Sequence, residues 1–182
     1  SASADEAAQE SERLRASIFT HFLLSGLRGA ADASRDGRVT IAEAYQFAFT
    51  ETLARTTSTR AGPQRPGWDI QLVGTGDLVL TDLRASDARL VLDASLAGRV
   101  NVLGVNGGLV VEVVKAPGKA VELGLEVGDY RVVVDDQQGH VGEAMVTLSP
   151  QSQQVLSRAG LTATSLETTV RRPIGGRRLV IP

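Results

Sequence analysis

The densest group of residues able to do chemistry lies between Asp32 and Glu43. Oxygen donors recur there around Gly37, which suits a sharp turn; the donors are Asp32, Ser34, Asp36, the backbone carbonyl of Arg38, Thr40 and Glu43. Hard cations such as Ca²⁺ take oxygen ligands, and this spacing is that of a calcium-binding loop between two helices. The run therefore indicates a calcium site as one interpretation.

The same run has a complete interpretation without metal. Gly37 can make the turn, and Thr40 with Glu43 forms a capping box that starts the next helix. Arg35 and Arg38 add positive charge beside the carboxylates, which disfavours a bound cation. We favour the capping interpretation, under which the protein requires no cofactor.

Nucleophilic and acid–base chemistry finds few candidates. The chain has no Cys and two His, so it supplies no thiolate nucleophile, iron–sulfur cluster or thiolate zinc site. His21 stands beside Phe22 in a predicted helix, where a partly buried, hydrogen-bonded ring is expected, and His140 follows a turn sequence that predicts a solvated ring. The sequence also lacks the motifs of serine hydrolases, zinc peptidases and phosphate-binding loops. We therefore expect no complete active site within this chain.

Composition excludes two classes of partner. Acidic and basic side chains nearly balance, with a formal net charge of -2, so a broad basic footprint for nucleic acid is not expected. No apolar run approaches the roughly 18 residues that a membrane-spanning helix needs. The sequence opens on Ser1 rather than Met, and we expect it to be a processed or truncated piece of a longer protein.

Two helices must position the loop. Apolar residues recur at helical spacing on both sides of it; the two stripes are Ile18, Phe19, Phe22, Leu23 and Leu27, then Ile41, Tyr45, Ala48, Phe49 and Leu53. The first helix is predicted to run from a capping box at Ser3 to Gly29, and the second from Thr40 to about Arg55. Because their connection is short, we expect the two helices to be packed neighbours.

The rest of the chain predicts strands. Residues 56–76 are rich in turn formers and predict a linker or an ordered surface loop. Beyond them, short Val- and Leu-rich runs recur about every ten residues, as in an antiparallel β-sandwich; they are 78–83, 89–92, 99–105, 109–114, 120–123, 130–134, 144–148 and a last one near 161–170. We therefore predict a helical part at 1–76, an all-β domain at 77–170 and an exposed Arg-rich tail at 171–182.

Five blocks in the first part resemble the small-subunit half of bacterial caspase-like peptidases, close to metacaspases. The blocks are Ser3–Asp5, Ser17–Leu24, Gly26–Asp32, Asp36–Glu43 and Gln64–Pro66. The resemblance covers roughly residues 1–80 and implies an α/β fold in which the helix pair packs on an incomplete sheet. It also implies a cysteine endopeptidase whose catalytic Cys and His lie on an upstream large-subunit segment, which would be a partner of this chain.

The same resemblance implies a role for Asp5 and Ser3. In the family a Ser-Ala-Asp segment places its Asp in the pocket that selects Arg or Lys at the cleavage position, and Ser3-Ala4-Asp5 is the matching segment. A buried carboxylate facing a guanidinium forms a charge-assisted pair, which gives the preference for Arg a physical basis. Protein or peptide substrates are therefore implied. An Asp in the first turn of a helix is also favourable for the helix dipole alone, so both interpretations stay open.

Residues 121–134 resemble a different family. Gly128 and Tyr130 match the strand entry of small transthyretin-like or carboxypeptidase-regulatory-like β-sandwich modules. This resemblance implies an accessory domain without identifying its ligand. Two alternatives to the peptidase hypothesis remain: a calcium-responsive binding module built on an EF-hand-like helix pair, and a pseudoenzyme whose β-sandwich binds a partner.

Overall fold

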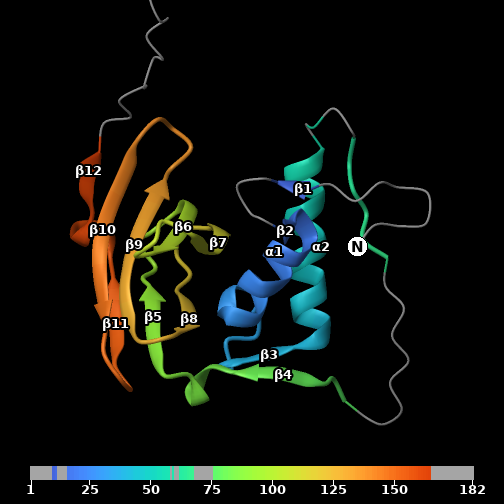
Figure 1. Ribbon diagram of the computed structural model, residues 1–182, viewed down its shortest axis with the longest axis horizontal. Coiled ribbons are helices and arrows are strands. Elements are labelled where there is room, and N and C mark those ends of the chain that lie inside the picture. Colours follow the sequence, from blue (N-terminus) through green and yellow to red (C-terminus); the bar gives the residue numbers. More distant parts are fainter. Residues whose placement is uncertain (1–9, 12–15, 58, 60–61, 68–75, 165–182) are drawn as a thin grey trace, which may run out of the picture.

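The computed structural model describes residues 10–11, 16–57, 59, 62–67 and 76–164 of the 182-residue chain. Within these ranges two N-terminal helices are followed by a small mixed sheet and a five-stranded antiparallel sheet. This confirms a mixed α/β architecture with the helices first. Figure 1 shows both helices standing on one side of the two sheets. No helix in the described ranges is long and apolar enough to span a membrane.

The first helix starts later than predicted. Glu10–Ser11 (β1) pairs with Ala16–Ser17 (β2), and α1 spans Ile18–Ser25. Ser17 caps it, because its side-chain oxygen accepts a hydrogen bond from the N–H of Thr20 at 3.2 Å. The predicted start at Ser3 lies outside the described residues. Over the described residues of 10–17, however, the helix prediction was wrong, since their backbone forms the β1–β2 pair.

The second helix, α2 (Ile41–Thr56), begins at the predicted capping box. The first helical segment ends in one wide turn, η1 (Gly26–Ala30). The loop that contains Asp32 and Asp36 then leads to α2. The buried face of α2 consists of small residues rather than the larger apolar stripe that the sequence suggested; it comprises Ala44, Ala48, Thr52 and Thr56. Small side chains let α2 pack closely against α1.

A two-stranded sheet links the helices to the rest of the molecule. It pairs β3 (Arg38–Thr40) with β4 (Val79–Asp82) in antiparallel register. Figure 1 shows β4 running below the helices toward the two larger sheets, which it reaches through η2 (Leu83–Ala85). Residues 78–83 were predicted to be extended, and β4 lies within them. β3 was not predicted, because it has only three residues and lies inside the loop between the two helices.

The remaining strands form two sheets. The larger has the order β12-β10-β9-β6-β7 and the smaller the order β11-β5-β8. The strands are β5 (Ala88–Leu92), β6 (Gly98–Gly104), β7 (Leu109–Lys115), β8 (Val121–Leu125), β9 (Gly128–Asp135), β10 (Val141–Leu148), β11 (Gln153–Leu156) and β12 (Thr162–Thr164), with a turn η3 (Arg158–Gly160) before the last. Alternate residues of β5 and β9 are buried, which is the pattern that predicted these strands.

Both sheets contribute to one hydrophobic core. Leu90 and Leu123 of the smaller sheet lie in the same buried cluster as Val100 and Val132 of the larger sheet, so the sheets pack face to face. The smaller sheet departs from a purely antiparallel sandwich, because β11 pairs in parallel with β5. Three of the four residues of β11 are exposed, and no hydrophobic pattern marks it.

Candidate functional site

The loop between the helices is organised by its own carboxylates. Asp32 Oδ1 accepts a hydrogen bond from the N–H of Arg35 at 2.7 Å, and Asp32 Oδ2 accepts one from the N–H of Gly37 at 3.0 Å. Gly37 has φ 77°, a left-handed conformation that glycine adopts without strain. Asp36 closes the next turn by accepting a bond from the N–H of Arg38 at 2.9 Å.

Glu43 closes the loop onto α2. Its Oε2 accepts bonds from the N–H and the hydroxyl of Thr40, both at 3.0 Å, and its Oε1 accepts one from the N–H of Ser34 at 3.2 Å. Burial opposes ionisation of this carboxyl, but the N–H groups of Thr40 and Ser34 outweigh burial and lower the pKa of Glu43. One carboxylate oxygen therefore serves the helix cap and the other holds the loop.

The predicted calcium ligands are close in sequence without forming a metal cage. In the part of the chain that the structure describes, no three His, Cys, Asp or Glu side chains gather in a metal-binding group. Arg38, whose carbonyl was a candidate ligand, directs its guanidinium to Asp82, with Nε 3.7 Å from Oδ2. Hydrogen bonds within the loop account for its geometry, and calcium binding stays a prediction.

The residues predicted to select substrate, Asp5 and Ser3, lie outside the described residues. His140 is exposed as predicted, whereas His21, which was expected to be partly buried and hydrogen-bonded, is buried and its Nε2 has no hydrogen-bond partner among the described residues. His21 is 6% exposed on α1, and His140 is exposed in the turn between β9 and β10, with Nδ1 2.9 Å from Oδ2 of Asp136.

The helical part covers one edge of each large sheet, and we call this contact the seam. β7 and β8 are terminal strands, so among the described strands their outer backbone groups have no partner. Side chains from the helical part supply partners instead. Ser25 Oγ accepts a hydrogen bond from the N–H of Glu112 at 3.2 Å, and Arg28 Nη1 donates to the carbonyl of Val110 at 2.8 Å. The helices and the sheets are therefore joined by specific polar contacts.

A buried carboxylate lies in the seam. Glu112 of β7 is 2% exposed, and its carboxylate is 3.5 Å from Nε2 of His21 and 3.5 Å from Nη1 of Arg55. It also pairs with Arg99 of β6. Burial opposes its ionisation, but His21 and the two guanidinium groups outweigh burial and lower the pKa of Glu112. Sequence reasoning missed this cluster, although a lone Glu within the Val-rich run 109–114 was a usable signal.

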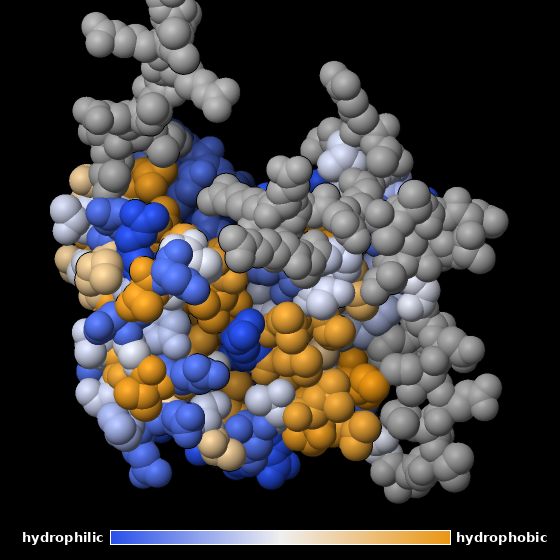
Figure 2. All heavy atoms as spheres, viewed as in Figure 1, coloured by the Kyte–Doolittle hydropathy of each residue, from blue (hydrophilic) through white to orange (hydrophobic). Residues whose placement is uncertain are grey.

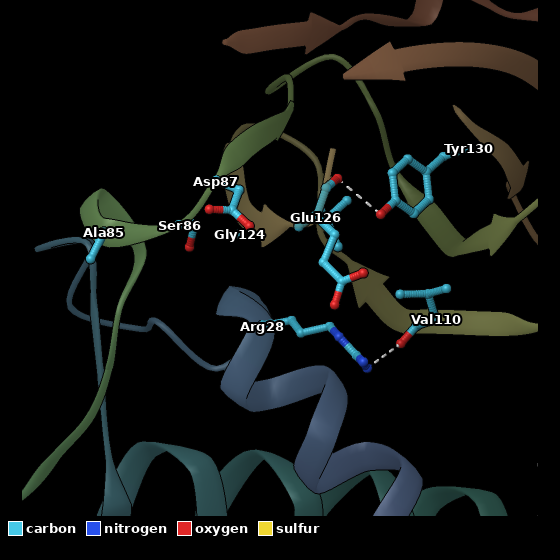
Figure 3. A pocket seen from close by; sticks show the side chains of 9 residues that line it. Arg28, Ala85, Ser86, Asp87, Val110, Gly124, Glu126 and Tyr130 are labelled. Atoms are coloured by element: carbon cyan, nitrogen blue, oxygen red, sulfur yellow. Dashed lines mark hydrogen bonds between the residues drawn. The ribbon is translucent and has the colours of Figure 1, made fainter. Parts of the chain in front are cut away.

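A cavity of about 380 Å³ opens beside the seam. Figure 3 shows Arg28 on one side of it and Glu126 above, with Asp87 on a separate segment. Tyr130 donates its hydroxyl hydrogen to the carbonyl of Glu126 at 3.0 Å. The cavity thus presents groups of both charges. No sequence pattern predicted it, because its lining residues come from distant segments.

Three features could therefore carry function: the capped loop, the charged seam and the cavity beside it. Comparisons with protein-family models, curated proteins and solved structures found no match for this chain.

Proposed function

We propose that this chain is the small-subunit and accessory portion of a caspase-like cysteine endopeptidase. The helical part then belongs to the peptidase fold, with its helix pair on an incomplete sheet. The two packed sheets form a transthyretin-like or carboxypeptidase-regulatory-like accessory domain. An upstream large-subunit segment carries the catalytic Cys and His, so the chain alone has no peptidase activity.

The observation that carries the proposal is the packing of one resemblance block, Gln64–Pro66, against α2, the helix that begins within the block Asp36–Glu43. Tyr45 of α2 donates its hydroxyl hydrogen to the carbonyl of Pro66 at 2.7 Å. The N–H of Gln64 donates to Thr56 Oγ1 at 2.8 Å, and Gln64 is 1% exposed. The block Gln64–Pro66 thus packs against the helix that an earlier block starts, as parts of a single subunit should.

An exposed apolar surface suits the large-subunit segment. Leu78, Val79 and Leu80 are 49%, 43% and 44% exposed, and among the described strands β4 pairs only with β3. Figure 2 shows apolar side chains gathered over the lower end of α2 and the β3–β4 pair. A free strand edge with aliphatic side chains favours the addition of another strand. In this proposal the large-subunit segment supplies that strand.

The chemistry is divided between the two segments. A thiolate of the large-subunit segment attacks the peptide carbonyl, and its His transfers a proton to the leaving amine. Asp5, with Ser3 beside it in the motif, contributes the carboxylate that faces Arg or Lys at the cleavage position. Cleavage after a basic residue is therefore the expected specificity.

Peptide hydrolysis by the chain with and without its upstream segment tests this proposal. The chain alone should be inactive, and the combined protein should cleave Arg peptides in preference to Asp peptides. Asp5→Ala should lower kcat/KM for Arg peptides by at least about 30-fold, because it unpairs a buried charge. Asp36→Ala, which removes an exposed loop carboxylate, should leave the selectivity unchanged. Activity of the chain alone, or full Arg selectivity in Asp5→Ala, contradicts the proposal.

A calcium-responsive binding module is the second candidate. The succession of structural elements in the loop favours it. The loop combines a glycine turn at Gly37, the short strand β3 and the Thr40 cap between two helices, which is the arrangement of an EF-hand. Isothermal titration with Ca²⁺ separates the candidates. Binding heat that Asp36→Ala abolishes supports the module, and no heat at millimolar Ca²⁺ removes it. A pseudoenzyme is distinguished by an upstream segment that lacks Cys.

A further inference from the structure

A second cavity, of about 260 Å³, lies where β9 turns into β10, and we call it the end pocket. Most of its lining is apolar: Leu96, Ala97, Val134, Val141, Leu161 and Ala163. Leu96 and Val134 belong to the shared core and are 1% and 4% exposed. The floor of the end pocket is therefore fixed by the packing of the two sheets.

One wall of the end pocket depends on a glycine. A Cβ at Gly142 would lie 3.0 Å from the Cβ of Leu161, which is too close for an ordinary contact. The absence of a side chain at Gly142 lets Leu161 lie against β10 and form the wall. The apolar part of the pocket is thus built by both the sheet and the segment after η3.

Polar groups occupy the rim. The N–H of Arg158 donates to Ser95 Oγ at 3.0 Å, which ties η3 to the connection between β5 and β6. Within the described ranges, no ion pair involves the guanidinium of Arg158. His140 directs Nδ1 to Asp136, and this leaves Nε2 as its free ring nitrogen. Asp136 also accepts hydrogen bonds from the N–H groups of Gln138 and His140, at 2.8 Å and 3.1 Å. These neighbouring donors stabilise the negative charge of its carboxylate.

We infer that the end pocket binds a small carboxylic acid with a short aliphatic chain. Arg158 is the carboxylate-binding group, because a guanidinium recognises a carboxylate through charge-assisted hydrogen bonds. The aliphatic chain lies on Val141 and Leu161, which are partly exposed apolar side chains of the lining. Pockets for drug-sized ligands measure roughly 300–1,000 Å³, so a pocket of about 260 Å³ favours a short acid over a long fatty acid. The inference does not rest on the peptidase proposal, since it uses only the two sheets and their connections.

Titration of the full chain with octanoate, followed by backbone amide chemical shifts, tests the inference. Saturable shifts are expected at Val134, Val141 and Leu161, with Kd below about 1 mM. Acetate has the charge without the chain, and octylamine has the chain with the opposite charge; each should bind at least tenfold more weakly. A peptide ending in Leu should also bind more weakly than octanoate. Octylamine or the peptide binding as tightly as octanoate, or no saturation by octanoate up to about 10 mM, overturns the inference.

Two arginine variants locate the carboxylate. Arg158→Gln should weaken octanoate binding by about 10–100-fold, the range for a lost hydrogen bond to a charged group. Arg131→Gln is the matched control, because Arg131 is an exposed β9 residue whose Nη1 lies 3.6 Å from Glu143 Oε2 outside the pocket. Binding that is unchanged in Arg158→Gln, or weakened equally in both variants, removes Arg158 as the carboxylate-binding group and overturns the inference.

Discussion

Arg28 of η1 donates a hydrogen bond from Nη1 to the backbone carbonyl of Val110 at 2.8 Å, in the place where a neighbouring strand would donate to β7. Together with Ser25, whose Oγ accepts a hydrogen bond from the N–H of Glu112, it supplies partners to an edge that no other described strand pairs. Edge strands that lack such protection recruit other chains. The helical part therefore covers the outer edge of β7 and protects it from pairing with other chains.

The contact from Arg28 should be measurable. Arg28→Met keeps much of the aliphatic stem but leaves the partly buried carbonyl of Val110 without a donor, so the free energy of unfolding should fall by about 1–3 kcal/mol. Arg28→Lys, which keeps a charged donor, should lose less. Urea unfolding of the full chain measures both values, and a Met variant as stable as the wild type would show that the bond contributes nothing.

Gly29 sets how closely the seam can pack. Its φ is 114°, and a Cβ there would lie 2.2 Å from the carbonyl oxygen of Glu122. Gly29→Ala should therefore destabilise the chain by about 2–4 kcal/mol, through backbone strain and overpacking. Gly107→Ala is the matched control: φ is 74° there, but nothing lies within 4 Å of the added Cβ. Its cost should stay near 1–2 kcal/mol. Equal losses in thermal or urea unfolding would mean that the close approach at Gly29 is unimportant.

Glu112 should make stability depend on acidity. Its pKa is lower in the folded chain than the ordinary value of 4.5, so its stabilising charge is fully present above pH 4.5 and is lost as the pH falls through the lowered pKa. Unfolding measured between pH 7 and pH 3 should show a smaller acid loss in Glu112→Gln than in the wild type. At pH 7, Glu112→Ala should cost about 1–3 kcal/mol, because it removes the charged partner of the partly exposed Arg55 and Arg99 side chains. Parallel pH profiles for wild type and Glu112→Gln would exclude this role.

The cap at Thr40 should stabilise α2 without metal. Thr40→Ala removes the side-chain acceptor for the N–H of Glu43 and should cost about 1 kcal/mol. Thr50→Ala, at an exposed position within the same helix, should cost less than half of that. Thermal unfolding with a chelator and with Ca²⁺ provides the measurement. A cost that appears only in the presence of Ca²⁺ would favour the calcium interpretation over the cap.

Local signals predicted the elements that local interactions build. Thr40 and Glu43 are three residues apart and cap α2 through contacts with each other, so the sequence alone placed this helix. The alternation in β5 and β9 likewise follows from one buried face. The start of α1 was misplaced because the Ala- and Glu-rich segment before it has helical composition, whereas Ser17 caps the helix several residues later.

Features built by distant residues escaped prediction. β11 is mostly exposed and exists as a strand through its register with β5, in which Gln153 lies opposite Arg89. The charged seam depends on Glu112 meeting side chains from three other elements, and no spacing rule relates those positions. Asp5 and Ser3 lie outside the described residues, so the predicted substrate pocket stays a prediction.

The parallel pairing of β5 with β11 also constrains how the protein is made. During synthesis β5 leaves the ribosome long before β11. The N–H groups of Arg89 in β5 and of Asp93 just after it donate to the carbonyls of Ser152 and Leu156, each at 2.9 Å. These acceptors are absent until the later segment has been made. Until then a hydrophobic strand presents an open edge to other nascent chains. Any shortened version that ends before residue 153 keeps that edge permanently, so expression trials should retain residues through Leu156 even when only the earlier strands are of interest.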